Sequence, residues 1–135
     1  MFYAWNFVLT HDRTEVTRTK HELDMEKGTI TRVEIVFPVG CANLVHIHLN
    51  DALHQVWPKD PQYKFIGDGV TVVCTDEYEI KEQPYTIQFY GWNEDDLYDH
   101  TITIRIQIVP AKEILHKVIS GLMGYTKISR PVEES

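Results

Sequence analysis

The sequence contains few cysteines, no long apolar run and fewer basic than acidic residues. Cys41 and Cys74 are the only cysteines among 135 residues, and they are too few and too far apart for a CxxC metal site. No apolar stretch approaches the roughly 20 residues that a membrane span needs. The N-terminal MFYAWNFVLTHDR lacks the basic start and apolar run of a cleaved secretory signal. We therefore expect a soluble chain without a signal peptide, in which Cys74 is a buried, reduced thiol.

Basic residues are fewer than acidic residues in this sequence. Lys and Arg total 13 against 20 Asp and Glu, which gives a formal net charge of −7. Surfaces that bind nucleic acid or anionic membranes are basic, so neither partner is expected. Hydrophobic residues make up 43% of the chain, enough for the core of one domain.

Most of the chain alternates between apolar and polar residues with the period of a β-strand. In Thr101–Ile108 the four isoleucines fall on one face, and Thr101, Thr103, Arg105 and Gln107 fall on the other. Further strands are expected around Leu23–Met25, Arg32–Phe37, Leu44–Leu49, Val70–Cys74 and Tyr85–Tyr90. No helical segment separates these runs, which excludes a parallel α/β sheet. We predict an all-β, antiparallel β-sandwich of jelly-roll or immunoglobulin-like type, with six to eight strands over residues 21–110.

Both ends of the chain carry apolar residues of their own. Residues 1–20 are expected to form an N-terminal arm, and residues 111–135 an amphipathic helix and tail. The predicted apolar stripe of the helix comprises Ile114, Leu115, Val118, Ile119, Leu122 and Met123. These stripes either fold back on the sandwich or contact a neighbour, and we favour a homo-oligomer because exposed apolar stripes mark interfaces.

His46 and His48 are two residues apart on a predicted strand, so their side chains share one face. Such a pair presents two metal nitrogens, and Gly40 with this HxH matches the start of the cupin pattern. The Glu that the cupin pattern requires a few residues later is missing, as is its second half. Since Val45, Ile47 and Leu49 occupy the opposite face, we expect the histidines to face solvent or a neighbouring subunit, with no metal or other cofactor.

Two further clusters have alternative interpretations. Trp5, Trp57 and Trp92 provide rings that stack on sugars when they are exposed and that fill a core or an interface when they are not. The acidic loop Asn93–Asp96 with Asp99 offers oxygen ligands for calcium, but it matches no EF-hand and is typical of a solvated hairpin loop. The predicted interface residues outside the helix are Phe2, Trp5, Trp57, His46 and His48.

No motif for catalysis is present. The sequence lacks GxSxG, HExxH and a phosphate-binding loop, and Gly67-Asp68-Gly69 is typical of a tight turn. We therefore expect a protein without enzymatic activity.

Several short segments carry a resemblance to a known group of proteins. They are Gly28-Thr29-Ile30, Phe37-Pro38-x-Gly40, Gln55-Val56-Trp57-Pro58, Trp92-Asn93-x-Asp95, and His100 with Ile108-Val109-Pro110. Over roughly residues 28–110 the chain resembles small β-sandwich proteins of tailed-phage particles. The resemblance implies a capsid decoration or accessory virion protein, a symmetric oligomer that binds another virion protein and occurs in the virion, or in the host cytoplasm before assembly.

Three functions are therefore open. The first is a non-enzymatic structural subunit that stabilises an assembly through its ends and one sheet face. The second is a carbohydrate- or surface-binding module that uses the tryptophans. The third is a metal-dependent enzyme that uses His46 and His48.

Overall fold

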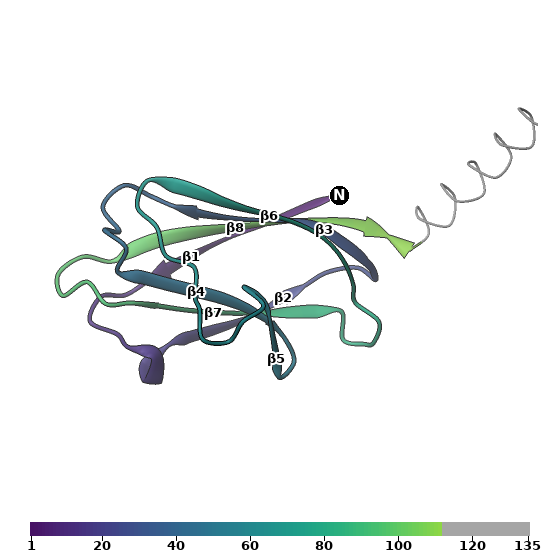
Figure 1. The fold of residues 1–135 in the computed structure, drawn as a ribbon, viewed down its shortest axis with the longest axis horizontal. Helices are drawn as coiled ribbons and strands as arrows, with labels where there is room; N and C mark the ends of the chain where they lie inside the picture. The colour runs from purple at the N-terminus through teal and green to yellow at the C-terminus, as the bar shows by residue number, and fades with distance from the viewer. Residues whose placement is uncertain (112–135) are drawn as a thin grey trace, which may run out of the picture.

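A computed structural model describes residues 1–111, which form eight β-strands and one short 3₁₀ turn (Figure 1). The turn is η1, Glu15–Thr17. The strands are β1 Phe2–Leu9, β2 Thr19–Asp24, β3 Gly28–Phe37, β4 Val45–Asp51, β5 His54–Trp57, β6 Val70–Glu79, β7 Thr86–Asn93 and β8 His100–Pro110.

The strands form two antiparallel sheets of four strands each, which confirms the all-β, antiparallel part of the predicted fold class. Sheet A has the order β1-β8-β3-β6, and sheet B has the order β2-β7-β4-β5. The two sheets lie as two layers (Figure 1).

Strand pairing follows a symmetrical rule in chain order. The first strand pairs with the last, β2 with β7, β3 with β6, and β4 with β5. Contacts between β8 and β3 and between β7 and β4 complete the sheets. Among the described strands only β4 and β5 form a hairpin between consecutive strands, so most pairings join distant parts of the chain.

The core lies between the sheets and follows from the alternation in the sequence. Ile102, Ile104, Ile106 and Ile108 of β8 are fully buried, whereas the intervening residues point outward. Val33, Ile35 and Phe37 of β3 and Val45, Ile47 and Leu49 of β4 are buried as predicted. Burial of each such side chain contributes on the order of 2 kcal/mol.

The alternation in β3 shifts at one place. Ile30 and Val33 both enter the core although they are three residues apart, because Thr31 is an extra residue against β8. A bulge of this kind realigns the pleat, so that both ends of a long strand direct their apolar side chains inward.

The N-terminal residues belong to the sandwich rather than to a separate arm. Phe2–Leu9 forms β1, which pairs with β8 from Phe2 opposite Gln107 to Leu9 opposite His100. The predicted boundary between residues 20 and 21 is therefore wrong, since the sandwich begins at β1 and β2 begins at Thr19. The aromatic side chains Tyr3, Trp5 and Phe7 of β1 pack against the core.

The predicted C-terminal helix and tail, including Ile114, Leu115, Val118, Ile119, Leu122 and Met123, lie outside the described residues. Within residues 1–111, no helix is long and apolar enough to cross a membrane.

Candidate functional site

Each sheet has two edge strands, and three of these four edges carry features that block pairing with another strand. The edge strands are β1 and β6 in sheet A, and β2 and β5 in sheet B. Strand β2 carries Lys20, Glu22 and Asp24, β5 has only four residues, and β6 ends in acidic residues and loses register against β3. Charge, shortness and irregularity are the usual protections of an exposed edge.

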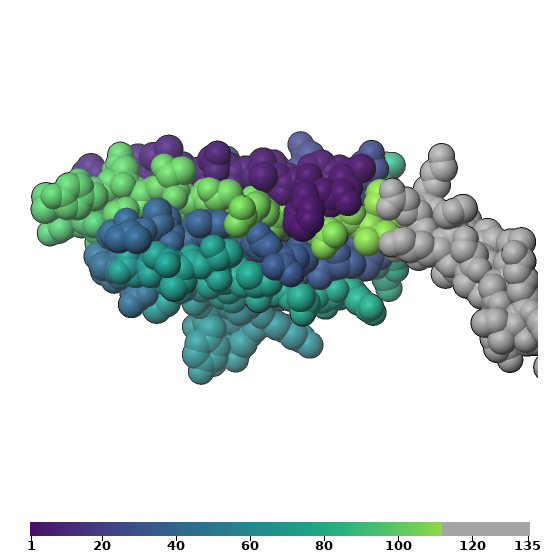
Figure 2. Space-filling model, turned by 90° about the horizontal axis from the view of Figure 1, so that it is seen from above, coloured from purple at the N-terminus to yellow at the C-terminus, as the bar shows by residue number. Residues whose placement is uncertain are grey.

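Strand β1 has none of these protections. Its sequence FYAWNFVL contains no charge and no proline, and its pairing with β8 continues without a register shift. The strand forms the rim of sheet A beside β8 (Figure 2, purple beside green). An eight-residue, uncharged and regular edge is a template for another strand.

The outward side chains of β1 are partly apolar. Phe2 is 56% exposed and Val8 is 62% exposed, and Ala4 and Asn6 between them are exposed as well. The Asn6 Oδ1 atom accepts a hydrogen bond of 2.7 Å from the Thr103 hydroxyl on β8. Phe2, predicted as an interface residue, therefore lies on the accessible side of this edge.

The inward side chains of β1 hold the edge against sheet B. The rings of Tyr3 and Trp5 stack at 5.7 Å, and the ring of Phe7 stacks on His21 of β2 at 4.3 Å. The Tyr3 hydroxyl accepts a hydrogen bond of 3.2 Å from the Glu26 backbone N–H. Trp5 is thus half-buried, on the opposite side of β1 from Phe2. These contacts fix the position of the strand, so the edge that no other strand of residues 1–111 covers is preformed.

The second candidate surface is the outer face of sheet B. His46 and His48 lie on the face opposite Val45, Ile47 and Leu49, as the alternation predicts. His46 stacks on Trp92 at 5.0 Å, and His48 stacks on Tyr90 at 4.8 Å, each pair lying across β4 and β7. His48 is only 6% exposed, so its predicted contact with solvent or a neighbour is wrong, because Tyr90 and Asn50 cover it.

The two histidines have different polar partners. His46 Nε2 lies 3.3 Å from Glu94 Oε1, and His48 Nδ1 lies 2.7 Å from Asn50 Oδ1. Burial lowers the pKa of His48, and the hydrogen bond to Asn50 opposes that shift. Within residues 1–111, no group of three or more His, Cys, Asp or Glu side chains is arranged to hold a metal ion. In this geometry each histidine of the HxH pair stacks on an aromatic ring of β7.

The tryptophan rings that a sugar platform requires are covered. Trp57 is 3% exposed and Trp92 is 5% exposed. Trp57 donates a hydrogen bond of 3.2 Å to Asp76 and meets the Tyr78 ring edge to face, while Trp92 donates to Glu94 at 3.0 Å. Trp57, predicted as an interface residue, instead closes the gap between β5 and β6 from inside.

A third cluster, which the sequence interpretation missed, lies where the loops β3–β4, β5–β6 and β7–β8 meet. His100 Nε2 lies 2.9 Å from Asp95 Oδ2, and both side chains are buried. The backbone N–H groups of Leu97 and Tyr98 donate to Asp95 Oδ1, and these bonds with the His100 contact lower the pKa of Asp95. In the acidic loop Asn93–Asp96, which the sequence offered as a calcium site, the Asp95 carboxylate therefore contacts His100 and backbone N–H groups of the chain itself.

Cys41 lies in the same region and completes a Cys, His and Asp set. Burial, with Asp68 and Asp95 nearby, raises the pKa of the Cys41 thiol to about 11. A thiol of this pKa is protonated at neutral pH and is a poor nucleophile. The set therefore has the residue types of a cysteine hydrolase without an activated nucleophile.

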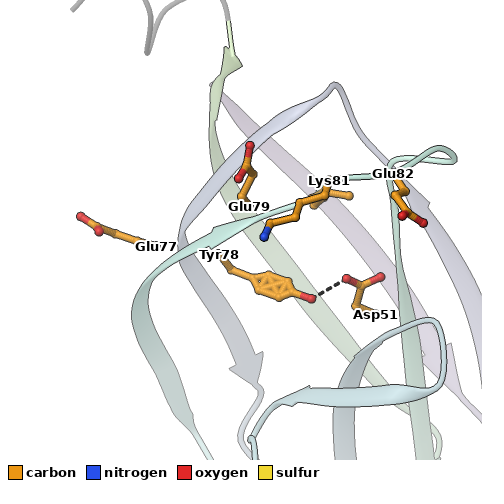
Figure 3. A pocket seen from close by; sticks show the side chains of 7 residues that line it. Asp51, Glu77, Tyr78, Glu79, Lys81 and Glu82 are labelled. Atoms are coloured by element: carbon orange, nitrogen blue, oxygen red, sulfur yellow. Dashed lines mark hydrogen bonds between the residues drawn. The ribbon is translucent and has the colours of Figure 1, made fainter. Parts of the chain in front are cut away.

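Two open grooves flank Tyr78 near the β5 and β6 edges. One groove of about 630 Å³ is lined by Asp51, Glu77, Tyr78, Glu79, Ile80, Lys81 and Glu82. The Tyr78 hydroxyl donates to Asp51 across this groove (Figure 3), and burial with that hydrogen bond raises the pKa of Tyr78 to about 12. The other groove, also about 630 Å³, is lined by residues that include Leu53, His54, Lys59 and Asp76. The acidic lining of the first groove is solvated and its tyrosine is held in its neutral form, so neither feature defines a reaction.

No family model matches this sequence, and a search of curated proteins finds none that is similar to it.

Proposed function

We propose that this chain is a non-enzymatic structural subunit of a virion, a jelly-roll protein of the capsid-decoration or accessory type. The strand order supports this proposal. Pairing of the first strand with the last, and so on inward to β4 and β5, is what results when one long two-stranded ribbon is wrapped into two sheets. This arrangement is the jelly roll, a fold of viral capsid proteins, lectins and cupins.

The surfaces favour the structural role over the other two functions. A lectin that stacks sugars on tryptophan needs exposed ring faces, and Trp57 and Trp92 are almost fully covered. A metal enzyme needs ligands that converge on one ion, and His46 and His48 are each engaged with a different aromatic ring and a different polar partner. The β1 edge, by contrast, is an accessible, preformed surface of the type that assembling subunits use.

The proposal is tested on particles. Virus particles purified by density gradient from cultures that carry the gene are expected to contain this chain at a fixed ratio to the major capsid protein. The chain is expected to stay with the particles after nuclease treatment, because the bond is to protein and not to nucleic acid. A chain that remains in the soluble fraction while intact particles band without it contradicts the proposal.

A further inference from the structure

We propose that β1 pairs antiparallel with β1 of a second copy of this chain, about a two-fold axis that passes between the two Trp5 residues. The pairing joins the two copies of sheet A into one continuous sheet. It rests on the proposed function for its biological role, and it adds to that function the surface and the partner.

The backbone of β1 defines which groups are free to pair. The Ile108 N–H donates to the Met1 carbonyl at 2.8 Å, so Met1 and Ile108 form a hydrogen-bonded pair between β1 and β8. In an antiparallel strand, alternate residues direct both N–H and C=O to the same side. Tyr3, Trp5 and Phe7 therefore bond to β8, whereas the even-numbered residues Phe2, Ala4, Asn6 and Val8 direct both groups to the open edge.

One register satisfies all of these groups. When Trp5 lies opposite Trp5 of the second copy, Phe2 lies opposite Val8 and Ala4 lies opposite Asn6. Each even-numbered residue then forms a hydrogen-bonded pair, and the Trp5 residues form the closer, non-hydrogen-bonded pair at the axis. A shift of two residues in either direction leaves Phe2 or Val8 of each copy without an opposite residue in the strand.

The side chains complement one another in the same register. On the outer face, the exposed Phe2 and Val8 form an aromatic and β-branched pair on each side of the axis. On the inner face, Tyr3 lies opposite Phe7, and the two Trp5 rings face each other. Because β1 has no charged residue, the axis brings no like charges together.

Self-complementarity favours a second copy of this chain as the occupant. At a two-fold interface, if residue i of one copy faces residue j of the other, then residue j of the first copy faces residue i of the second. In the register above, the apolar Phe2 faces the apolar Val8 and the small Ala4 faces the polar Asn6, so the two copies of β1 complement each other. The other edges lack this property because β2 and β6 carry charges and β5 is short.

The dimer is tested by analytical ultracentrifugation of the purified full chain. Wild-type protein is expected to sediment as a dimer. Ala4→Pro removes one edge-facing N–H without removing a bond to β8, so it is expected to give a monomer with at least a tenfold weaker association. Ala4→Ser keeps the N–H and is expected to remain a dimer. Circular dichroism establishes that each variant is folded, and Val8→Lys, which leaves the backbone intact, is expected to give a monomer if Ala4→Pro does not fold.

The register is tested by disulfide trapping. Ala4→Cys chains mixed with Asn6→Cys chains under mild oxidation are expected to form a cross-linked heterodimer. Neither variant alone is expected to cross-link, because residue 4 does not face residue 4 and residue 6 does not face residue 6. Wild-type chain oxidised alone controls for the native thiols of Cys41 and Cys74, and cross-linking is scored relative to it.

A wild-type chain that stays monomeric, a dimer that persists in both Ala4→Pro and Val8→Lys, or cross-linking of either cysteine variant alone overturns the proposal. These outcomes are independent of the virion role. A monomer that nevertheless bands with particles removes only the β1 pairing, and a β1 dimer that never bands with particles removes only the virion role.

Discussion

The rings of His48 and Tyr90 lie parallel across strands β4 and β7, with centroids 4.8 Å apart and planes 8° from parallel. The Arg18 guanidinium lies 5.1 Å from the centroid of the Tyr90 ring, and the Lys20 ammonium lies 5.9 Å from it. An imidazolium at His48 would form in a buried site where the cations Lys64 and Arg18 oppose its charge and Glu15 favours it. Burial and these two cations lower the pKa of His48 and so favour its neutral form.

This arrangement makes stability depend on pH through His48. Burial lowers its pKa in the folded state below the ordinary value of 6.5, so the unfolded chain binds the proton more readily than the folded one. The contribution of His48 to the free energy of unfolding is complete above its unfolded-state pKa. It is lost as the pH falls from there to its folded-state pKa. In urea titrations from about pH 7.5 to 5, we expect the free energy of unfolding to fall less steeply for His48→Phe, which keeps the ring but does not titrate, than for wild type.

Asn50→Ala provides a control with a distinct expectation. Its side chain holds His48 Nδ1 at 2.7 Å, and this bond raises the pKa of His48 against the effect of burial. Removal of the bond is expected to lower that pKa further and to steepen the loss of stability on acidification. Equal slopes in wild type, His48→Phe and Asn50→Ala contradict the role assigned to His48.

The Asp95 and His100 pair predicts a second dependence of stability on pH, in which the titrating group is an acid and not a base. The backbone bonds from Leu97 and Tyr98 and the His100 contact lower the pKa of Asp95, so its stabilising contribution is complete above its unfolded-state pKa. That contribution is lost as pH falls through the folded-state pKa. Asp95→Asn is expected to unfold at lower denaturant concentration at pH 7 and to lose less stability than wild type when the pH is lowered below about 4.

Asp96→Asn is the matched control for Asp95→Asn, because Asp96 is the neighbouring carboxylate in the same loop and is exposed. We expect its denaturation midpoint to stay close to that of wild type. A similar loss in both variants indicates a general charge effect of the loop and contradicts a specific role of Asp95.

The alternation in the sequence was sufficient to predict most strands but not their partners. The isoleucines of β8 and the buried residues of β3 and β4 face the core as expected, because burial of one face imposes a period of two. Strand β1 was missed because its aromatic residues occur on both sides of the strand, which hides the alternation, and because its partner β8 lies about 100 residues away along the chain.

The same limit applies to the sites. Phe2 and Trp5 are predicted as interface residues from their apolar character. The sequence does not indicate that they lie on an edge strand, because β1 becomes an edge only through its pairing with the distant strand β8. His48 was predicted on the outer face, yet its burial depends on Tyr90, which pairing places beside it from β7. His100 and Asp95 meet because the β7–β8 loop turns back on itself, and the acidic residues Glu94, Asp95 and Asp96 of that loop are the signal that the sequence offers.

Thiol reactivity is expected to separate the two cysteines. Cys41 is fully buried and its pKa is raised to about 11, whereas Cys74 is half-buried on the edge strand β6 and its pKa is raised by burial and by Asp76. With Ellman's reagent at neutral pH, we expect native protein to react slowly at Cys74 and far more slowly at Cys41, and both to react at once in denaturant. Cys74→Ala is expected to be almost unreactive while folded. A fast native reaction in that variant shows a reactive Cys41 and contradicts the assignment.

Gly28 lies where β3 begins, beside the end of β8. A Cβ atom added at this position would overlap the Val109 carbonyl oxygen and would lie 2.9 Å from the Pro110 Cα atom, both of which belong to the backbone. Gly28→Ala therefore separates the two central strands of sheet A, because backbone atoms cannot move aside as a side chain does. Overpacking of this kind costs about 1–3 kcal/mol in the free energy of unfolding. Thr29→Ala is the matched control, since its Cβ is already accommodated, and it is expected to cost less than Gly28→Ala in the same denaturation followed by tryptophan fluorescence. An unfolding free energy for Gly28→Ala equal to that of wild type contradicts the close approach of β3 and β8.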